Sequence, residues 1–415
     1  MRICKIYAGV YPWEVRVEKV ARTLAEAGHE VHLLCRRGPE QPLTETIDGI
    51  TVHRCVIPGR LPRKLERIST IPVPLNPVWT RRLIRIVREF TIELLLVRDI
   101  PLALNALAVG QQAGIPVVLD MAENYPAMLR DLLRWSNKKA VHLLFKNSYL
   151  AALVERRVVR QCHHILVVVE ESLERLVQMG ISSETISIVS NTPRLFPLDV
   201  SRSDTSSSGD GQPLRLIYVG GLQVGRGLEE MLYALREFRR RCRIRLTILG
   251  EGPTRARLEL LSGQLGLNES VRFRGWVDPA IVPAYIRDSD VGVVPHIVTR
   301  HTNTTIPNKL FDYMAHARPV LVSDAGPMQR IVRQEHCGLC YRSGDVDDIV
   351  RKLGILSDPD MRVVLGSNGR RAVVERYNWS QDGATLVTTI QSVIAKQGGD
   401  KVPSVIRARA HRVLK

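Results

Sequence analysis

Short apolar runs alternate along most of the chain with amphipathic stretches of about ten to fifteen residues, which is typical of buried strands connected by helices. The runs form two series separated by a polar segment. One amphipathic stretch, residues 15–27, is closed by Gly28, a residue type favoured just after a helix. Both series therefore predict parallel sheets made of β-α-β units. The expected strands are 3–7, 31–35, 51–55, 94–97, 117–119, 165–169 and 186–189, then 215–219, 245–249, 271–274, 291–294, 319–322 and 338–341.

The polar segment, residues 198–213, consists mainly of Ser, Asp and Gly and has little to bury, which predicts a linker. It separates a first domain over 1–197 from a second over 214–379. A helix at about 380–397 is expected to pack back on the first domain, and 398–415 form a basic tail. The fold class is therefore α/β, with two doubly wound Rossmann-like domains facing a cleft. Ligands of such sheets bind at the carboxyl ends of strands, so we expect an interdomain site.

Composition narrows the partners and the compartment. The chain has 59 Lys and Arg residues and 42 Asp and Glu residues, which leaves a net charge of +17. This charge favours polyanions as binding partners. Aromatic residues make up only 5% and are not interleaved with the basic clusters, which disfavours nucleic acid. Seven cysteines, an odd number mostly inside apolar runs, indicate a reducing compartment. The first residues enter a strand pattern without a signal peptide, and no apolar run is long enough to span a membrane. We expect a cytoplasmic protein.

Basic residues gather in two stretches of the first domain, 54–88 and 130–160. Apolar residues accompany the first stretch, a mixture typical of a helix on an anionic membrane surface. A solvated basic face with its apolar side in the core has the same pattern. The first interpretation predicts peripheral attachment at the inner face of the plasma membrane and a lipid-linked acceptor. The basic residues of the first stretch include Arg60, Arg63, Lys64, Arg67, Arg81, Arg82, Arg85 and Arg88.

A glycine-rich turn opens the second domain. The strand at 215–219 runs into Gly220-Gly-Leu-Gln-Val-Gly-Arg-Gly227, and a helix follows over 228–240. Glycines let the backbone approach a phosphate, the helix terminus offers free N–H groups, and Arg226 adds positive charge. The spacing matches neither the dinucleotide fingerprint nor the Walker loop. We interpret this segment as an anion cradle, although a plain tight turn would have the same sequence.

The segment Pro307–Ala315 carries a second candidate. Pro307 and Asn308 suit a helix start, and Lys309 and Asp312 lie one turn apart. Lys309 and the first amides could hold a pyrophosphate, and Asp312 could accept hydrogen bonds from sugar or ribose hydroxyls. An exposed ion pair on an ordinary helix is the alternative.

Other motifs are weaker. Gly250-Glu-Gly-Pro253 follows the strand at 245–249, where a simple turn would explain it equally well. The Cys337-x-x-Cys340 motif has no second pair at metal spacing, so no zinc site is expected. His296 and His301 lie near the proposed anion site and could contact its ligand.

In this order and spacing, the motifs resemble GT-B fold glycosyltransferases of the retaining family 4 type, the glycosyl transferases group 1. The resemblance covers nearly the whole chain and implies that the first domain receives the acceptor while the second binds a nucleotide sugar. In the first domain it rests on Tyr11-Pro and on 21–31, 163–172 and 188–191. In the second it rests on 220–227, 250–253, 273–277, 307–315, 322–326, 338–345 and 376–379.

The resemblance also implies roles for residues. Arg226 takes the lysine position of a phosphate clamp, Lys309 lies at the pyrophosphate, and Glu123 faces the transferred sugar. Asp312 is expected on the ribose, and the backbone of Trp276 and Val277 at the nucleobase. No metal and no cofactor are expected besides the UDP- or GDP-linked sugar. The implied donor contacts are Gly220, Gly221, Gly227, Gly250, Glu251, Gly252, Trp276, Val277, Asn308 and Asp312, and the acceptor-side contacts are Tyr11, Arg16 and Asp99.

Three positions depart from the family pattern. Gly221 replaces an arginine, Thr304 replaces the acid that precedes Asp312 by eight positions, and Ala122 replaces the histidine before Glu123. The implied function is transfer of a sugar from a nucleotide-diphosphate sugar to a glycan or lipid-linked acceptor, with retention and without metal, in polysaccharide or glycolipid biosynthesis. A nucleotide-sugar epimerase of the same fold, and a catalytically degenerate protein that serves as a partner-binding subunit, remain alternatives.

Overall fold

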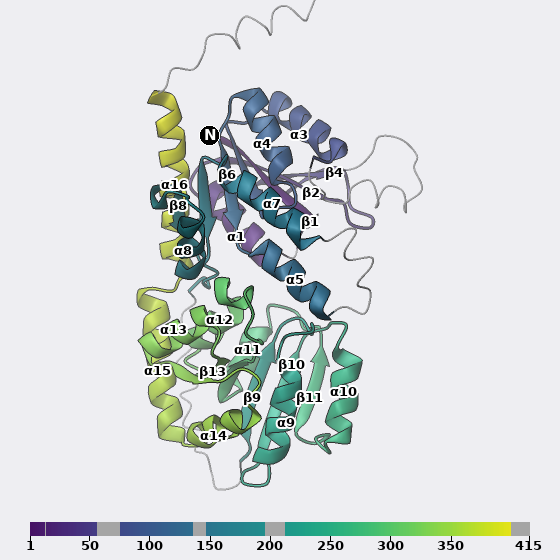
Figure 1. Ribbon diagram of the computed structural model, residues 1–415, viewed down its shortest axis with the longest axis vertical. Coiled ribbons are helices and arrows are strands. Elements are labelled where there is room, and N and C mark those ends of the chain that lie inside the picture. Colours follow the sequence, from purple (N-terminus) through teal and green to yellow (C-terminus); the bar gives the residue numbers. More distant parts are fainter. Residues whose placement is uncertain (13, 56–74, 136–146, 196–211, 400–415) are drawn as a thin grey trace, which may run out of the picture.

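Two sheets, each covered by helices on both faces, form two domains stacked along the long axis of the molecule (Figure 1). The fold class expected from the sequence is confirmed. The computed structural model describes residues 1–12, 14–55, 75–135, 147–195 and 212–399. Most of the expected linker, 198–213, and most of the basic tail, 398–415, lie outside these described residues.

The first sheet has eight strands in the order β3-β4-β2-β1-β5-β6-β7-β8. All of its pairs are parallel except β3 with β4, a hairpin turned by Asp48 and Gly49 at positive φ. The sequence analysis missed β3, because its residues are alternately exposed and half-buried and form no apolar run. The strands are β1 Arg2–Val10, β2 Glu30–Arg36, β3 Thr44–Ile47, β4 Ile50–Cys55, β5 Leu94–Arg98, β6 Val117–Met121, β7 His164–Val167 and β8 Ile186–Ile188.

Successive residues of these strands face opposite sides of the sheet, so the first domain has two cores. Ile3 lies in the core covered by α1 and α16, whereas Cys4 lies in the core covered by α3, α4 and α7. The first-domain helices are α1 Val15–Glu26, α3 Pro77–Glu89, α4 Ala103–Ala113, α5 Tyr125–Trp135, α7 Ser148–Val159 and α8 Glu170–Gln178, with the short 3-10 helix η1 Ser183–Thr185.

Helix α3 decides between the two interpretations of the first basic stretch for the part that is described. Its apolar residues Trp79, Leu83 and Ile86 are buried in the core, and Arg81 and Arg85 point to solvent. The apolar side of α3 is therefore not free to enter a membrane. Arg60, Arg63, Lys64 and Arg67 lie outside the described residues.

The second sheet has six parallel strands in the order β11-β10-β9-β12-β13-β14, at the segments expected from the apolar runs. The strands are β9 Leu214–Val219, β10 Ile244–Leu249, β11 Val271–Gly275, β12 Val291–Val294, β13 Val320–Ser323 and β14 Gly338–Tyr341. The helices are α9 Leu228–Phe238, α10 Arg255–Gln264, α11 Val282–Arg287, α12 Asn308–Ala315, α13 Gly326–Glu335, α14 Val346–Leu356 and α15 Pro359–Glu375, with the 3-10 helix η2 Thr302–Thr304.

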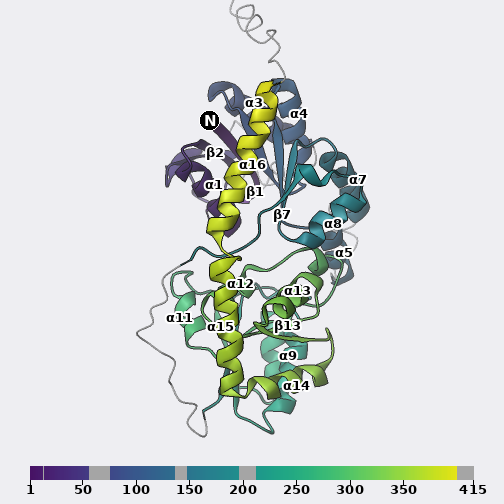
Figure 2. The same cartoon turned by 90° about the vertical axis from the view of Figure 1, so that its left-hand side faces the viewer.

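The chain returns to the first domain through α16, Trp379–Gly399, which corresponds to the helix expected at about 380–397. Figure 2 shows α15 and α16 following one another along one side of both domains. Trp379 anchors this return: its side chain is 4% exposed, and its indole N–H donates to Thr23 Oγ1 at 2.8 Å. Its backbone N–H donates to the Pro193 carbonyl at 2.8 Å, so the start of α16 is also tied to the first-domain segment that follows β8.

We predict that Trp379→Ala lowers the free energy of unfolding by about 3–5 kcal/mol, because it removes a buried aromatic ring and leaves a cavity. Urea denaturation followed by circular dichroism measures the loss. Leu260→Ala on α10 is the control, since that side chain is 64% exposed and should change stability by less than about 0.5 kcal/mol. Equal stability of the two variants would contradict the anchoring role of Trp379.

Candidate functional site

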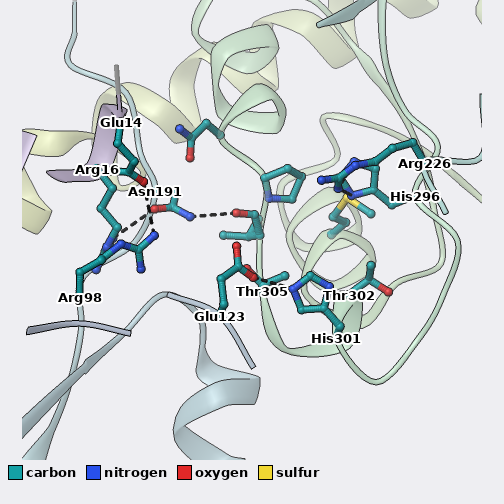
Figure 3. Close-up of a pocket in the computed structure, with 14 residues that line it drawn as sticks. Glu14, Arg16, Arg98, Glu123, Asn191, Arg226, His296, His301, Thr302 and Thr305 are labelled. Carbon is teal, nitrogen blue, oxygen red and sulfur yellow. Dashed lines mark hydrogen bonds and ion pairs between the residues drawn. The ribbon is translucent and has the colours of Figure 1, made fainter. Parts of the chain in front are cut away.

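A cavity of about 180 Å³ lies between the two domains, where loops at the carboxyl ends of both sheets meet (Figure 3). Its walls carry mainly charged and polar side chains, as a site for a charged or hydroxyl-rich ligand requires. The first domain contributes Glu14, Arg16, Arg98, Glu123 and Asn191. The second contributes Arg226, His296, His301, Thr305 and Asn308, among others.

Basic side chains gather at the second-domain end of the cavity. Arg226 donates through Nη1 to His296 Nε2 at 3.1 Å. Burial lowers the pKa of His296 well below its usual value, and the charges of Arg226 and Lys309 add to the effect, so the imidazole is neutral and can accept this bond. Lys309 Nζ lies 3.8 Å from the centroid of the Tyr218 ring, a cation–π contact.

The charged form of the Lys309 side chain is unfavourable at this position. Burial lowers the pKa of Lys309 well below its usual value, and repulsion by Arg226 lowers it further, while Asp312 partly offsets both. An anion bound between Arg226 and Lys309 would favour the charged forms of both side chains. This end of the cavity is therefore suited to a phosphate or diphosphate.

The glycine-rich turn brings Arg226 to its position. Gly227 has a φ of +66° and precedes α9, and a Cβ atom there would overlap the carbonyl oxygen of Pro295. Glycine is required because the turn must pack against the loop that carries His296. At Gly225 a Cβ atom would overlap the ring of Trp135, so glycine here lets the first-domain helix α5 lie against the turn.

Helix α12 begins at Asn308, which lines the cavity, directly after Pro307. The helix is fixed under the end of β9, because the Val219 backbone N–H donates to Tyr313 Oη at 2.9 Å. Asp312 lies one turn further on, where burial raises the pKa of its carboxyl to about 6 despite the nearby charges of Lys19 and Lys309. Asp312 does not line the cavity.

A buried ion network supports the first-domain wall. Asp120, at the end of β6, is contacted by Lys5 Nζ at 2.9 Å and by Arg16 Nη2 at 2.7 Å, and all three side chains are at most 2% exposed. Burial alone would raise the pKa of Asp120, but Arg16 and Lys5 hold it well below its usual range. Arg16 also donates to the Val189 carbonyl at 2.8 Å, which ties the loop carrying Asn191 to α1.

The turn after β6 places Glu123 in the cavity. Asp99 Oδ1 accepts the backbone N–H groups of Ala122 at 2.9 Å and of Glu123 at 3.2 Å, and its Oδ2 lies 2.9 Å from Arg98 Nη1. Burial raises the pKa of Asp99 to about 6. The Glu123 carboxylate lies across the domain boundary from His301, with Oε2 2.6 Å from His301 Nε2. Burial would raise the pKa of Glu123, but this hydrogen bond and the charges of Arg98 and Arg226 lower it.

The structure brings part of the expected site together. Arg16, Glu123, Arg226 and Asn308 line the cavity, whereas Lys309 does not line it but lies close enough to Arg226 and His296 for their charges to interact. The expected glycines hold the strand-end loops in place through backbone bonds, such as Gly220 N–H to the Leu249 carbonyl at 2.8 Å and Gly250 N–H to the Gly275 carbonyl at 2.7 Å. Five donor-side candidates remain. Glu251 pairs with Arg255, Trp276 is 66% exposed, and Val277 is half-buried. The other two are Gly221 and Gly252.

Two acceptor-side candidates, Tyr11 and Asp99, do not line this cavity. Tyr11 is 1% exposed and packs in the core with α1, so its side chain does not reach the cavity. Asp99 is 8% exposed and holds the turn that carries Glu123. Sequence reasoning did not single out Glu14 and Arg98, although Arg98 ends a strand at the carboxyl edge, where side chains of a site are expected.

Residues 301–306 of the second domain form a seam with the first domain. Further hydrogen bonds cross this seam besides the contact between His301 and Glu123. Asn124 Nδ2 donates to Thr304 Oγ1 at 3.1 Å, and Ser172 Oγ donates to the Thr304 carbonyl at 2.5 Å. Thr305 Oγ1 donates to the Ala122 carbonyl at 3.1 Å. Ala122 and Thr304, two of the positions that depart from the family pattern, therefore both lie at this seam.

Comparison with known proteins supports, for both domains, the resemblance that the sequence motifs indicate. The family model "Glycosyl transferase 4-like domain" matches residues 13–192, and "Glycosyl transferases group 1" matches residues 213–358. No group of three His, Cys, Asp or Glu side chains in the described residues is placed to hold a metal ion. Within the same residues, no helix has the length and apolar character needed to cross a membrane.

Three known proteins illustrate the similarity. The MMP alpha-(1->4)-mannosyltransferase of Mycolicibacterium hassiacum is 24% identical over 92% of this chain and 95% of its own length. The GDP-mannose-dependent alpha-(1-6)-phosphatidylinositol monomannoside mannosyltransferase of Mycolicibacterium smegmatis is 28% identical over 39% of this chain and 43% of its own. The structure of sucrose-phosphate synthase from Thermosynechococcus elongatus has a TM-score of 0.77 at 19% identity, covering 95% of this chain and 99% of that one.

We predict that Arg226→Ala and Lys309→Ala each weaken binding of a nucleoside diphosphate by about 1–3 kcal/mol, because each removes a charge-assisted contact. Isothermal titration calorimetry with UDP and GDP measures the change. Arg257→Ala is a matched control, since Arg257 is an exposed arginine on α10 that pairs with Glu229 away from the cavity. Unchanged affinity in both test variants would show that the diphosphate does not bind at this end of the cavity.

Proposed function

This chain belongs to the glycosyl transferases group 1 family, and we propose that it transfers a sugar from a UDP- or GDP-linked donor with retention and without a metal ion. The acceptor is a hydroxyl group of a glycan or of a lipid-linked sugar, in polysaccharide or glycolipid assembly. One observation carries the proposal: Arg226 and His296 line one end of the interdomain cavity, opposite Glu123 and the first-domain wall, and Lys309 lies close enough behind them for their charges to interact.

The leaving group explains why positive charge is needed there. When the bond between the sugar C1 and the diphosphate oxygen breaks, negative charge grows on the diphosphate. Arg226 and Lys309 stabilise that charge from fixed positions, together with the first amides of α12. Side chains thus supply the positive charge that a divalent cation supplies in metal-dependent enzymes.

Retention follows if the acceptor attacks the face from which the diphosphate departs. A new bond forms between the acceptor oxygen and C1 as the old bond breaks, and the acceptor proton passes to the departing phosphate oxygen. No side chain is then required as general base. The Glu123 carboxylate contributes by accepting hydrogen bonds from the sugar and by favouring positive charge near C1.

The first-domain wall is suited to an acceptor rich in hydroxyl groups. Glu14 and Glu123 offer carboxylate oxygens, while Arg98 and Asn191 offer N–H groups, all within the same cavity. Sugar hydroxyls both donate and accept, so they match such a mixed set. Arg98 is already paired with Asp99, which favours a neutral group over an added phosphate at this position.

We predict that UDP or GDP, but not both equally, raises the melting temperature of the protein in the presence of EDTA. A ligand at 100 times its Kd adds about 2.7 kcal/mol to stability. Once a donor is identified, proton NMR of the first-formed sugar product should show the donor's own anomeric configuration. A shift abolished by EDTA would contradict metal independence, and an inverted anomer would contradict retention.

We also propose peripheral attachment to the cytoplasmic face of a membrane, through α7 rather than α3. The exposed side of α7, called here the α7 surface, combines large apolar and basic side chains. That combination suits an anionic lipid surface, where each basic residue adds about 1 kcal/mol. The α7 surface consists of Tyr149, Leu150 and Leu153, which are 76%, 54% and 64% exposed, and of the exposed Arg156, Arg157 and Arg160.

We predict that replacing Tyr149, Leu150 and Leu153 together by Ser cuts binding to vesicles of phosphatidylcholine and phosphatidylglycerol at least tenfold. Co-sedimentation measures the fraction of protein bound to the vesicles. The matched comparison changes two sets of three arginines to Gln: Arg156, Arg157 and the C-cap residue Arg160 of α7, and Arg81, Arg85 and Arg88 of α3. The α7 set should lose more binding than the α3 set, although the charge change is identical. Equal losses would mean that overall charge, and not the α7 surface, drives attachment.

A further inference from the structure

The pair of Glu123 and His301 joins the two domains inside the cavity (Figure 3). Glu123 follows β6 of the first domain, and His301 lies just before η2 of the second. Their side chains are 34% and 16% exposed, and Glu123 Oε2 lies 2.6 Å from His301 Nε2. The pair can exist only while the domains are close, since each partner belongs to a different sheet.

The backbone of Glu123 is held by its own domain, but its carboxylate is not. Asp99 accepts the backbone N–H of Glu123 at 3.2 Å, which fixes where the side chain starts. Among the described residues, His301 is the hydrogen-bond partner found for the Glu123 carboxylate. Binding through Oε2 leaves Oε1 available to a ligand. The direction of this carboxylate therefore depends on the second domain.

His301 itself sits on a stiff turn. Thr302 Oγ1 donates to the Ile297 carbonyl at 3.0 Å, and Thr304 Oγ1 donates to the Arg300 carbonyl at 3.0 Å. Asn303 Oδ1 accepts the backbone N–H of Gly326 at 2.9 Å, which fastens the turn to α13. The same turn holds the seam contacts of Thr304 and Thr305. Docking of the turn on the first domain thus places His301 against Glu123.

We propose that His301 is a positioning residue that orients the Glu123 carboxylate toward the sugar of the bound donor. The pair forms when the second domain, which carries the donor, closes on the first. Closure and assembly of the sugar-facing site are then one event, so an open enzyme holds no aligned carboxylate. This inference rests on the proposed function, because it assigns Glu123 to the donor sugar.

A merely structural ion pair would behave differently, and the chain offers one for comparison. Arg330 on α13 contacts Glu171 on α8 through Nε at 2.8 Å, and it also contacts Glu170. This group joins the same two domains but does not line the cavity. Arg330→Gln therefore removes a partly exposed contact between the domains without changing a side chain of the site.

The test compares His301→Ala, His301→Gln, Glu123→Gln, the double variant His301→Ala/Glu123→Gln, and Arg330→Gln. We expect His301→Ala to lower kcat about 10- to 100-fold, the effect of a misplaced group, with the Kd for UDP or GDP within about twofold. His301→Gln should recover part of the rate, because its amide can still donate to Glu123. The double variant should be no slower than Glu123→Gln alone, as expected for residues acting as one unit. Arg330→Gln should leave kcat within about threefold.

Hydrogen exchange of residues 120–126 in the UDP- or GDP-bound protein provides a readout without turnover. Exchange should be faster in His301→Ala than in the unmodified protein and in Arg330→Gln. The inference is overturned if His301→Ala keeps both full kcat and full protection, if Arg330→Gln matches its losses, or if the double variant loses the product of the single effects. Lack of any sugar transfer by the unmodified protein would instead count against the proposed function, and the exchange comparison would still decide the pairing.

Discussion

Positive charge concentrated at the carboxyl edge of the second sheet is the constraint on which the rest of the site depends. Arg226 and Lys309 repel each other there, and burial lowers the pKa of Lys309 well below its usual value. A neutral His296 accepts from Arg226, and Tyr218 offers its ring to Lys309. Neither the neutral imidazole nor the aromatic ring brings a negative charge to this place. The charge that remains is what a departing diphosphate needs.

The two domains contribute differently charged walls to the site. The first-domain wall pairs its charges internally, with Asp120 between Lys5 and Arg16. That network makes the surface of the first domain rigid, because its charged groups are already satisfied, and on the proposed function this surface receives the acceptor. The second domain keeps its charge for a ligand. The Glu123 carboxylate, which we propose faces the sugar, is shared between them, since its backbone belongs to one domain and its hydrogen-bond partner to the other.

The sequence predicted the strands well because buried parallel strands are continuous apolar runs, which need no knowledge of the rest of the fold. β3 was missed because its pairing is set by a turn at Asp48 and Gly49 and not by burial. The seam could not be predicted. Glu123 and His301 are separated by 178 positions, and their contact depends on how two domains dock. Tyr11 was placed at the acceptor because its motif matches the family, but packing against α1 takes the side chain into the core.

Helix α5 connects the cavity with the proposed membrane surface. Its last residue, Trp135, lies against the glycine-rich turn that carries Arg226, and the helix packs along α7. A lipid-linked acceptor held by the α7 surface would therefore stand one helix away from the phosphate end of the cavity. The large positive charge of the chain then has two separate uses. Under this proposal, exposed arginines attract an anionic surface, where water and salt screen them, whereas the few in the cavity act on a ligand at short range.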